Sequence, residues 1–346
     1  MRTLLIGANG QLGSDLRKAL NPEISPKASL EDARTNKFVH ATPLLLIPLT
    51  HADIEITDFN QVKEILERHR PDVVINTAAY NRVDDCEDNI ERAFNVNAYG
   101  VRNLAIACKN IDATLVHFST DYVFDGLKTT PYKEDDAPRP ISVYGISKLT
   151  GEYFIRYILK RYFIIRTCGL YGIVRHGESA SGATGSKSKG GNFVELMLRF
   201  AREGREIKVV NDQVLTPTST KELARKVCQL IGIASSASGG HRNDMYGLYH
   251  ITNNGACSWH EFAKEIFKIE GLSPVGARCN VPLRETTSEA YGARAKRPAY
   301  SVLDHCNLRK LGLDDMKDWK EALKTYLLER QKSPLPQPSP LLGEDR

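Results

Sequence analysis

The stretch TLLIGANGQLGSDLRKAL, residues 3–20, decides the fold of this chain. Its apolar start predicts a strand, its centre holds three glycines, and SDLRKAL is typical of a helix. In such a unit the absent side chains let the backbone approach a pyrophosphate group, which the positive end of the helix attracts. The stretch therefore predicts a dinucleotide site rather than a structural turn, with cofactor contacts from Gly7, Asn9, Gly10, Gln11, Leu12 and Gly13.

Short apolar runs continue to alternate with amphipathic segments after this unit. The pattern predicts an α/β fold with a Rossmann-type, doubly wound parallel sheet, whose ligands lie at the carboxyl ends of its strands. Expected strands are 3–8, 44–49, 72–78, 114–120, 162–170 and 207–212, and expected helices include 58–69, 91–110 and 142–159.

The rhythm of the sequence changes after about residue 170. We expect residues 1–172, with later returning segments, to form the cofactor-binding domain, and 173–330 to form mainly a smaller C-terminal substrate-binding lobe. The Gly/Ser-rich stretch 175–191 is typical of a loop, and 21–42 lengthens the connection to the second strand. The Pro-rich tail 331–346 is expected to be disordered.

The composition favours a compact protein with a solvated surface. A net charge of +5 is spread over 346 residues, and the basic clusters lack interleaved aromatics, which argues against a nucleic-acid partner. Seven cysteines form no CxxC pair, so reduced thiols are favoured over disulfides or a metal site. No signal segment is recognisable, and the apolar runs are shorter than the roughly 18 residues of a membrane helix. We expect a cytoplasmic protein without a membrane partner.

The end of the second expected strand bears on the choice of cofactor. An acid there would hold the ribose of NAD, whereas this chain has Thr50 and His51, so NADPH is the expected cofactor and NADH the alternative. Further contacts are predicted near the adenine and beside the third strand. The residues concerned, each equally compatible with an ordinary strand end, are Glu55, Ile56, Ala78, Ala79 and Tyr80.

Tyr144 and Lys148 lie one turn apart on the same face of an expected helix. An ammonium beside a phenol favours the phenolate and lowers the pKa toward the range for proton transfer. Thr120, at the carboxyl end of the fourth expected strand, is placed to hydrogen-bond a substrate carbonyl. Asn97 either orders a water beside Lys148 or is an ordinary helix asparagine with its hydrogen bonds satisfied.

Together these motifs resemble the extended short-chain dehydrogenase/reductase group and, within it, the dTDP-4-dehydrorhamnose reductase family. The resemblance spans about residues 1–330, outside the two insertions, and rests on GANGQLG (7–13), NTAAY (76–80), STDYVFDG (119–126), YGISK (144–148), GGNFVE (190–195), DQVLTPT (212–218) and RPAYSVLD (297–304). It implies reduction of the C4 ketone of dTDP-4-dehydro-L-rhamnose to dTDP-L-rhamnose by NADPH or NADH.

The resemblance also implies roles for individual residues. Tyr144 would donate the proton, and Thr120 would polarise the carbonyl. Lys148 would adjust the pKa of Tyr144 and bind the nicotinamide ribose. Residues placed around the nucleotide-sugar are Asp121, Tyr122, Asn192, Thr216, Pro217 and Arg297, with the arginine as a diphosphate partner.

Alternatives stay open at this point. The chain has Arg166-Thr-Cys-Gly169 where the family often has RTSW, so the sugar is not settled. Another nucleotide-sugar reductase, epimerase or dehydratase is the nearest rival, although Tyr122 replaces the glutamate of the dehydratases. A non-catalytic subunit similar to the methionine adenosyltransferase beta subunit is the rival from another class. Either a monomer or a homodimer is compatible with the sequence.

Overall fold

The six-stranded sheet at the centre of the molecule is parallel throughout. The computed structural model describes residues 1–21, 45–173, 192–235, 245–272 and 282–332. The strand order is β10-β5-β4-β3-β1-β2. The strands are β1 (Arg2–Ile6), β2 (Leu45–Leu49), β3 (Val73–Asn76), β4 (Thr114–Thr120), β5 (Tyr162–Thr167) and β10 (Gly247–His250). Since β1 pairs with both β2 and β3, the chain order reverses there, and this switch point is where such sheets bind ligands.

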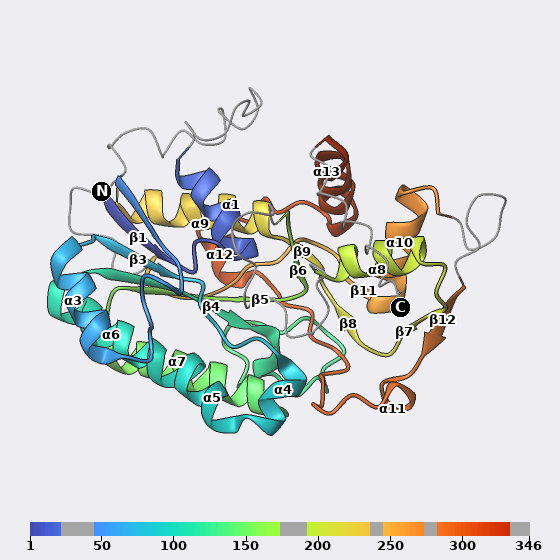
Figure 1. The fold of residues 1–346 in the computed structure, drawn as a ribbon, viewed down its shortest axis with the longest axis horizontal. Coiled ribbons are helices and arrows are strands. Elements are labelled where there is room, and N and C mark those ends of the chain that lie inside the picture. The colour runs from blue at the N-terminus through green and yellow to red at the C-terminus, as the bar shows by residue number, and fades with distance from the viewer. Residues whose placement is uncertain (22–44, 174–191, 236–244, 273–281, 333–346) are drawn as a thin grey trace, which may run out of the picture.

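Helices cover both faces of the sheet because its strands are apolar on both sides. Leu4 packs into one core with helices α3 and α6, and its neighbour Leu5 packs into the other with α1 and α9. Figure 1 shows these two helical layers on opposite sides of the sheet. One layer holds α3 (Phe59–His69), α6 (Val101–Ile111) and α7 (Val143–Ile158); the other holds α1 (Gln11–Leu20), α9 (Thr220–Ser235) and α12 (Cys306–Lys310).

A third hydrophobic core belongs to the C-terminal part of the chain. Phe262 and Leu323, both fully buried, are among its members. Apart from α9 and α12, the helices that the structure describes in this part of the chain are α8 (Phe193–Arg202), α10 (Trp259–Ile269), α11 (Ser288–Tyr291) and α13 (Trp319–Lys332). The short strands outside the main sheet are β6 (Leu170–Tyr171), β7 (Ile207–Val210), β8 (Val214–Leu215), β9 (Thr218–Ser219), β11 (Cys257–Ser258) and β12 (Leu283–Thr286). A capping box of Ser258 and Glu261 begins α10.

The predicted doubly wound fold is confirmed, with one correction. The run 207–212 forms β7, but β7 pairs with β12 in a separate two-stranded sheet. Lys208 is exposed within it, which suits a sheet covered on one face only. The last strand of the main sheet is instead β10. The proposed division at residue 172 stays a prediction, and β10 and α9 are segments that return to the first part.

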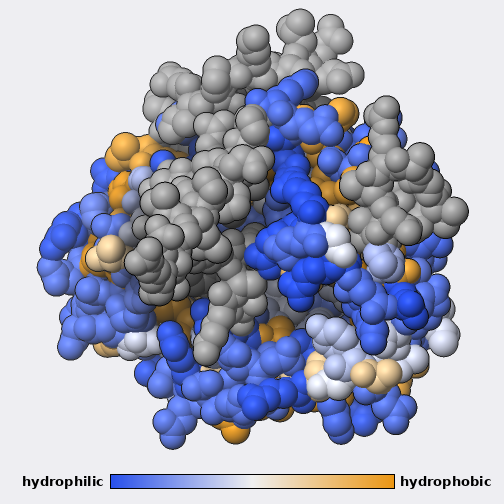
Figure 2. Space-filling view, turned by 45° about the vertical axis from the view of Figure 1, so that its right-hand side comes forward, coloured by the Kyte–Doolittle hydropathy of each residue, from blue (hydrophilic) through white to orange (hydrophobic). Residues whose placement is uncertain are grey.

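Several predicted segments fall partly or wholly outside the described residues. The stretch 175–191, nearly all of 21–42, and 333–346 lie there. The first two residues of the expected tail, 331 and 332, are the end of helix α13. Within the described parts of the chain, the helices are too short or too polar to cross a bilayer. Hydrophilic residues cover most of the described surface on the face shown in Figure 2.

Candidate active site

The glycine turn between β1 and α1 is built for close backbone approach. Gly7 has a positive φ of 79°, and a Cβ there would lie 2.4 Å from Thr77 Oγ1. A Cβ on Gly13 would lie 2.2 Å from the carbonyl oxygen of Gly7, so the helix packs directly on the turn. Gly10 precedes the first residue of α1. The turn therefore offers a side-chain-free cradle at a helix N-terminus, which fits a dinucleotide pyrophosphate.

An acid that sequence reasoning missed lies at the end of β2. The Asp53 carboxylate accepts hydrogen bonds from both the backbone N–H and the hydroxyl of Thr50, each at 2.7 Å. These bonds lower the pKa of Asp53. The His51 side chain is 77% exposed and lies 3.6 Å from Glu55. A turn of three residues brings the carboxylate back to the strand end, a contact that reading along the strand alone does not reveal.

Two other predicted cofactor residues, Ile56 and Asn97, make contacts within the protein itself. Ile56 is buried in the core under α6, close to Gly100. Asn97 lies in a π-helical segment, Asn95–Gly100, and its amide bonds the backbone N–H and C=O of Tyr80, both at 2.9 Å, and Ser147 Oγ at 3.1 Å. The second interpretation of Asn97, a satisfied asparagine, matches these contacts. The amide fixes the Tyr80 loop against α7.

The predicted catalytic groups meet beyond β4. Thr120 is the last residue of that strand, and its hydroxyl accepts from the backbone N–H of Tyr122 at 3.1 Å. The same hydroxyl is hydrogen-bonded to the Tyr144 phenol. Tyr144 as a whole is half-buried. The rings of Tyr122 and Tyr144 meet edge to face with centroids 5.9 Å apart. A hydroxyl and a phenol thus share one corner at the carboxyl edge of the sheet.

Lys148 contacts the backbone of β4 rather than the phenol. Its Nζ donates to the carbonyl oxygen of Phe118 at 2.6 Å and lies 3.4 Å from His117 Nε2. Burial lowers the pKa of Lys148 to about 8. The expected lowering of the Tyr144 pKa is wrong for this structure: burial raises that pKa, and the nearby Asp121 carboxylate raises it further. Desolvation of the phenol is the main cause of this rise.

Part of the predicted sugar-binding set surrounds these groups. Arg297 reaches Tyr122, and its guanidinium pairs with Asp84 at 2.8 and 3.1 Å. Asp121 contacts Thr120 at 3.0 Å and is also hydrogen-bonded by Ser301, a residue that the sequence did not single out. The diphosphate role of Arg297 stays a prediction, since two of its nitrogens are engaged by a carboxylate of helix α4 (Val83–Asp88).

The remaining predicted sugar residues are placed differently. Thr216 is buried; its hydroxyl donates to the carbonyl oxygen of Gly255 at 2.7 Å, and its own backbone carbonyl oxygen accepts from Cys168 Sγ at 3.1 Å. A Cβ on Gly169 would lie 2.9 Å from Leu215 and 3.1 Å from Pro217 Cα. Asn192 caps helix α8 and bonds Gly172 O at 2.8 Å, so its side chain serves the C-terminal core rather than the corner at Thr120.

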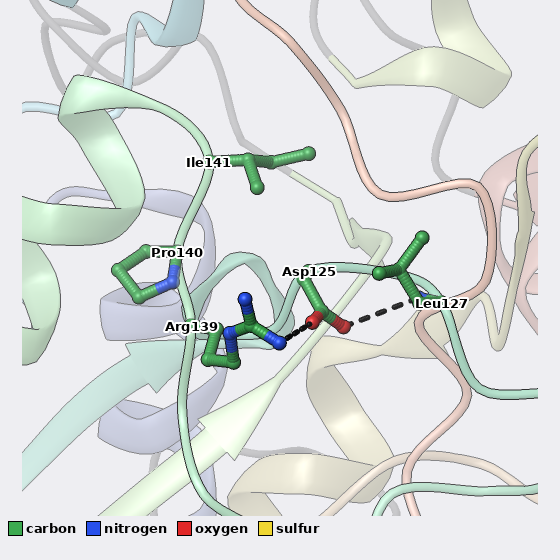
Figure 3. A pocket seen from close by; sticks show the side chains of 5 residues that line it. All are labelled: Asp125, Leu127, Arg139, Pro140 and Ile141. Atoms are coloured by element: carbon green, nitrogen blue, oxygen red, sulfur yellow. Dashed lines mark hydrogen bonds and ion pairs between the residues drawn. The ribbon is translucent and has the colours of Figure 1, made fainter.

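A surface hollow of about 580 Å³ lies on the connection between β4 and α7. Asp125 and Leu127 line it from the segment after β4, and Arg139 to Ile141 line it from the segment before α7 (Figure 3). Asp125 pairs with Arg139 at 3.6 Å and accepts from Tyr132 at 2.8 Å. The two walls therefore adjoin β4, which ends at Thr120, and α7, which carries Tyr144.

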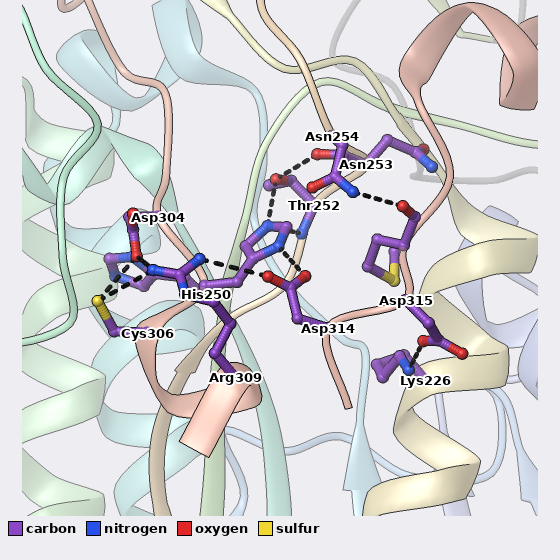
Figure 4. A network of polar contacts seen from close by, with 12 residues as sticks. Lys226, His250, Thr252, Asn253, Asn254, Asp304, Cys306, Arg309, Asp314 and Asp315 are labelled. Atoms are coloured by element: carbon purple, nitrogen blue, oxygen red, sulfur yellow. Dashed lines mark hydrogen bonds and ion pairs between the residues drawn. The ribbon is translucent and has the colours of Figure 1, made fainter. Parts of the chain in front are cut away.

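Figure 4 shows a second polar cluster, which includes Thr252 and Asp314. The Nδ1 of His305 pairs with Asp314 at 2.9 Å, and its Nε2 lies 2.8 Å from Thr252 Oγ1. This order of hydroxyl, imidazole and carboxylate has the form of a nucleophilic triad. Thr252, however, is fully buried, and its hydroxyl donates to the carbonyl oxygen of Asn253 at 2.9 Å. The cluster holds the chain after β10 against the chain around α12.

The fold and the site define a nicotinamide-dependent oxidoreductase of the short-chain dehydrogenase/reductase type. Residues 1–332 match the family described as RmlD substrate binding domain. The chain belongs to the dTDP-4-dehydrorhamnose reductase family.

Three similar proteins illustrate the match. The spore coat polysaccharide biosynthesis protein SpsK of Bacillus subtilis is 37% identical over 329 residues, which cover 95% of this chain and 98% of that protein. A dTDP-4-dehydrorhamnose reductase of Streptomyces griseus is 36% identical, covering 93% of this chain and 91% of that one. The crystal structure of the Bacillus anthracis dTDP-4-dehydrorhamnose reductase in complex with NADP is 36% identical with a TM-score of 0.77, covering 95% of this chain and 99% of that one.

Proposed function

We propose that this chain reduces the C4 ketone of a nucleotide-linked 6-deoxy-4-keto sugar, with dTDP-4-dehydro-L-rhamnose as the substrate and dTDP-L-rhamnose as the product. The meeting of Thr120 with Tyr144 at the carboxyl edge of β4 carries this proposal. The reduced nicotinamide supplies the hydride when it is bound. Thr120 polarises the ketone, and the Tyr144 phenol, kept protonated by its raised pKa, gives its proton to the ketone oxygen.

Lys148 is assigned to the nicotinamide ribose. Its buried position one turn along α7 supports this role. Reduction is favoured over dehydration because Tyr122 stands where elimination would need a second acid. It is favoured over a regulatory role because the hydroxyl, the phenol and the ammonium are all present and lie on adjoining elements.

The reductant we propose is NADPH, with NADH as the weaker alternative. The exposed His51 at the end of β2 supports a contact with a 2′-phosphate, and the relative from Bacillus anthracis binds NADP. Asp53 acts in the opposite direction, since a carboxylate at this place repels a phosphate and suits a ribose hydroxyl. We assign the enzyme to the cytoplasm, which the six free thiols among the described cysteines support.

One assay tests the activity. Purified protein is mixed with NADPH and enzymatically prepared dTDP-4-dehydrorhamnose, and the absorbance of the reduced nicotinamide is followed. We expect oxidation of NADPH by the wild type and a fall of kcat by roughly 10²- to 10⁴-fold in Tyr144→Phe, the size of a lost proton donor. An inactive wild type, or a fully active Tyr144→Phe variant, would contradict the proposal.

A further inference from the structure

The hydroxyl of Thr120 is shared among three neighbours. The backbone N–H of Tyr122 donates to it at 3.1 Å, Asp121 Oδ1 lies 3.0 Å away, and the Tyr144 phenol is also hydrogen-bonded to it. A hydroxyl carries one hydrogen and two lone pairs. The N–H of Tyr122 takes one lone pair, so one hydrogen and one lone pair remain for Asp121 and Tyr144. One of these two side chains must accept from Thr120 and the other must donate to it.

The protonation state of Asp121 decides which arrangement forms. An ionised carboxylate only accepts, so the Thr120 hydrogen points to Asp121 and the remaining lone pair draws the proton of Tyr144. A protonated carboxyl donates to that lone pair, and the Thr120 hydrogen then turns toward the phenol oxygen. In this second arrangement the proton of Tyr144 is free to go to a substrate ketone, and Thr120 polarises that ketone through the phenol to which it donates.

We propose that Asp121 is a positioning residue whose proton sets the direction of the Thr120 and Tyr144 hydrogen bonds, and that the protonated form is the active one. The inference rests on the proposed ketone reduction and adds a control on the same site. No bond to carbon changes in this step. One proton is gained by Asp121 from solvent, and the two hydroxyl hydrogens reorient.

The surroundings of Asp121 make this titration accessible. The residue is 3% exposed, and burial raises its pKa to about 6, while hydrogen bonds from Ser301 and Thr120 oppose the rise. The carboxyl is therefore mostly protonated below that pH and mostly ionised above it. Ser301 is the second contact through which this pKa can be changed without touching Thr120.

The other titratable groups that face Asp121 are neutral in the same range. Tyr144 faces it from α7, Tyr122 from its own turn and Cys168 from the segment after β5, and burial raises the pKa of each of them. The charged Arg297 faces Tyr122 and is paired with Asp84. A pH dependence near 6 in this corner thus belongs to Asp121.

The pH profile of kcat is the first test. In the wild type kcat should fall as the pH rises through about 6. Asp121→Asn should remove this fall, and Ser301→Ala should move it to higher pH because a hydrogen bond that lowers the pKa is lost. Asp125→Asn, a control from the same strand-end motif, should keep the wild-type midpoint. Persistence of the fall in Asp121→Asn, or an unmoved midpoint in Ser301→Ala, would overturn the inference.

A second measurement needs no turnover. With tyrosine labelled by carbon-13 at Cζ, the Tyr144 signal, assigned through Tyr144→Phe, should shift with a midpoint near 6 in the wild type and stay constant in Asp121→Asn. Thr120→Val should abolish most of the shift. If the signal moves equally in Thr120→Val, the hydroxyl does not transmit the change and the inference is wrong. An inactive wild type would contradict only the proposed function, because the NMR titration tests the role of Asp121 without turnover.

Discussion

Glu152 and Arg166 form a buried ion pair that joins helix α7 to strand β5. The guanidinium bonds both carboxylate oxygens, at 2.7 and 2.9 Å, and the side chains are 0% and 1% exposed. Ser119 donates to the same carboxylate from β4. One carboxylate thus ties α7, which carries Tyr144 and Lys148, to two adjacent strands.

Removal of Glu152 should therefore destabilise the protein strongly. In Glu152→Ala the guanidinium of Arg166 stays buried without its partner, and one of its nitrogens already has no hydrogen-bond partner. We expect the free energy of unfolding, measured by urea denaturation, to fall by about 3 to 5 kcal/mol.

The matched control is Glu64→Ala, which breaks an exposed pair with Arg68 on α3. Its loss should stay within about 1 kcal/mol. Equal losses in the two variants would show that the buried pair does not anchor α7.

Lys148 is expected to lower stability while it serves turnover. Its pKa is lowered by burial from 10.5 to about 8. Between these values the unfolded chain binds more protons than the folded chain, so the free energy of unfolding rises with pH across that window, and the full cost of the buried charge is present below it.

Lys148→Met should consequently be more stable than the wild type at pH 7, by about 1 to 3 kcal/mol, and should lose most of its turnover. Unfolding at several pH values checks the sign, with Lys63→Met on the exposed face of α3 as the control. A variant that is less stable and fully active would contradict both assignments.

The sequence reveals those parts of the molecule that depend on local pattern. The apolar runs predict the strands from β1 to β5, and the serine at position 142 marks the start of α7, where it caps the helix. The run that became β7 is apolar enough for the main sheet, but pairing with β12 is decided by a segment more than 70 residues away. Such long-range pairing leaves no local signal.

In the site, too, local features can be predicted from the sequence and long-range contacts cannot. The positions of Thr120 and Tyr144 follow from a strand end and a helix face, which are local features. The contacts of Asp121 with Ser301 and of Arg297 with Asp84 join segments about 180 and 213 residues apart, so only the folded chain brings them together. Gly169 is explained by packing: its φ of 56° and its neighbours Leu215 and Pro217 leave no space for a side chain.

Gly13 should matter for folding and Gly10 for cofactor binding. A Cβ at Gly13 meets a backbone oxygen at 2.2 Å, whereas at Gly10 the nearest atom is 3.2 Å away. Gly13→Ala should lower the melting temperature by several degrees, since a clash with backbone costs about 1 to 3 kcal/mol. Gly10→Ala should melt close to the wild type but bind the dinucleotide more weakly in a fluorescence titration. Equal melting temperatures for both variants would refute this division.

Asp53 should set the preference between NADPH and NADH. Its carboxylate is held at the end of β2 by two hydrogen bonds from Thr50, which lower its pKa, so it is ionised at neutral pH. A charge close to a 2′-phosphate in water costs about 1 kcal/mol, or roughly fivefold in affinity. Asp53→Asn keeps the size of the side chain and should improve KM for NADPH relative to NADH by about that factor, with kcat nearly unchanged. The control is Glu67→Gln, which removes an exposed carboxylate near the C-terminal end of α3. It should leave the ratio of the KM values for NADPH and NADH unchanged. If parallel titrations of the two cofactors give the same ratio in Asp53→Asn as in the wild type, this carboxylate does not face the adenosine ribose.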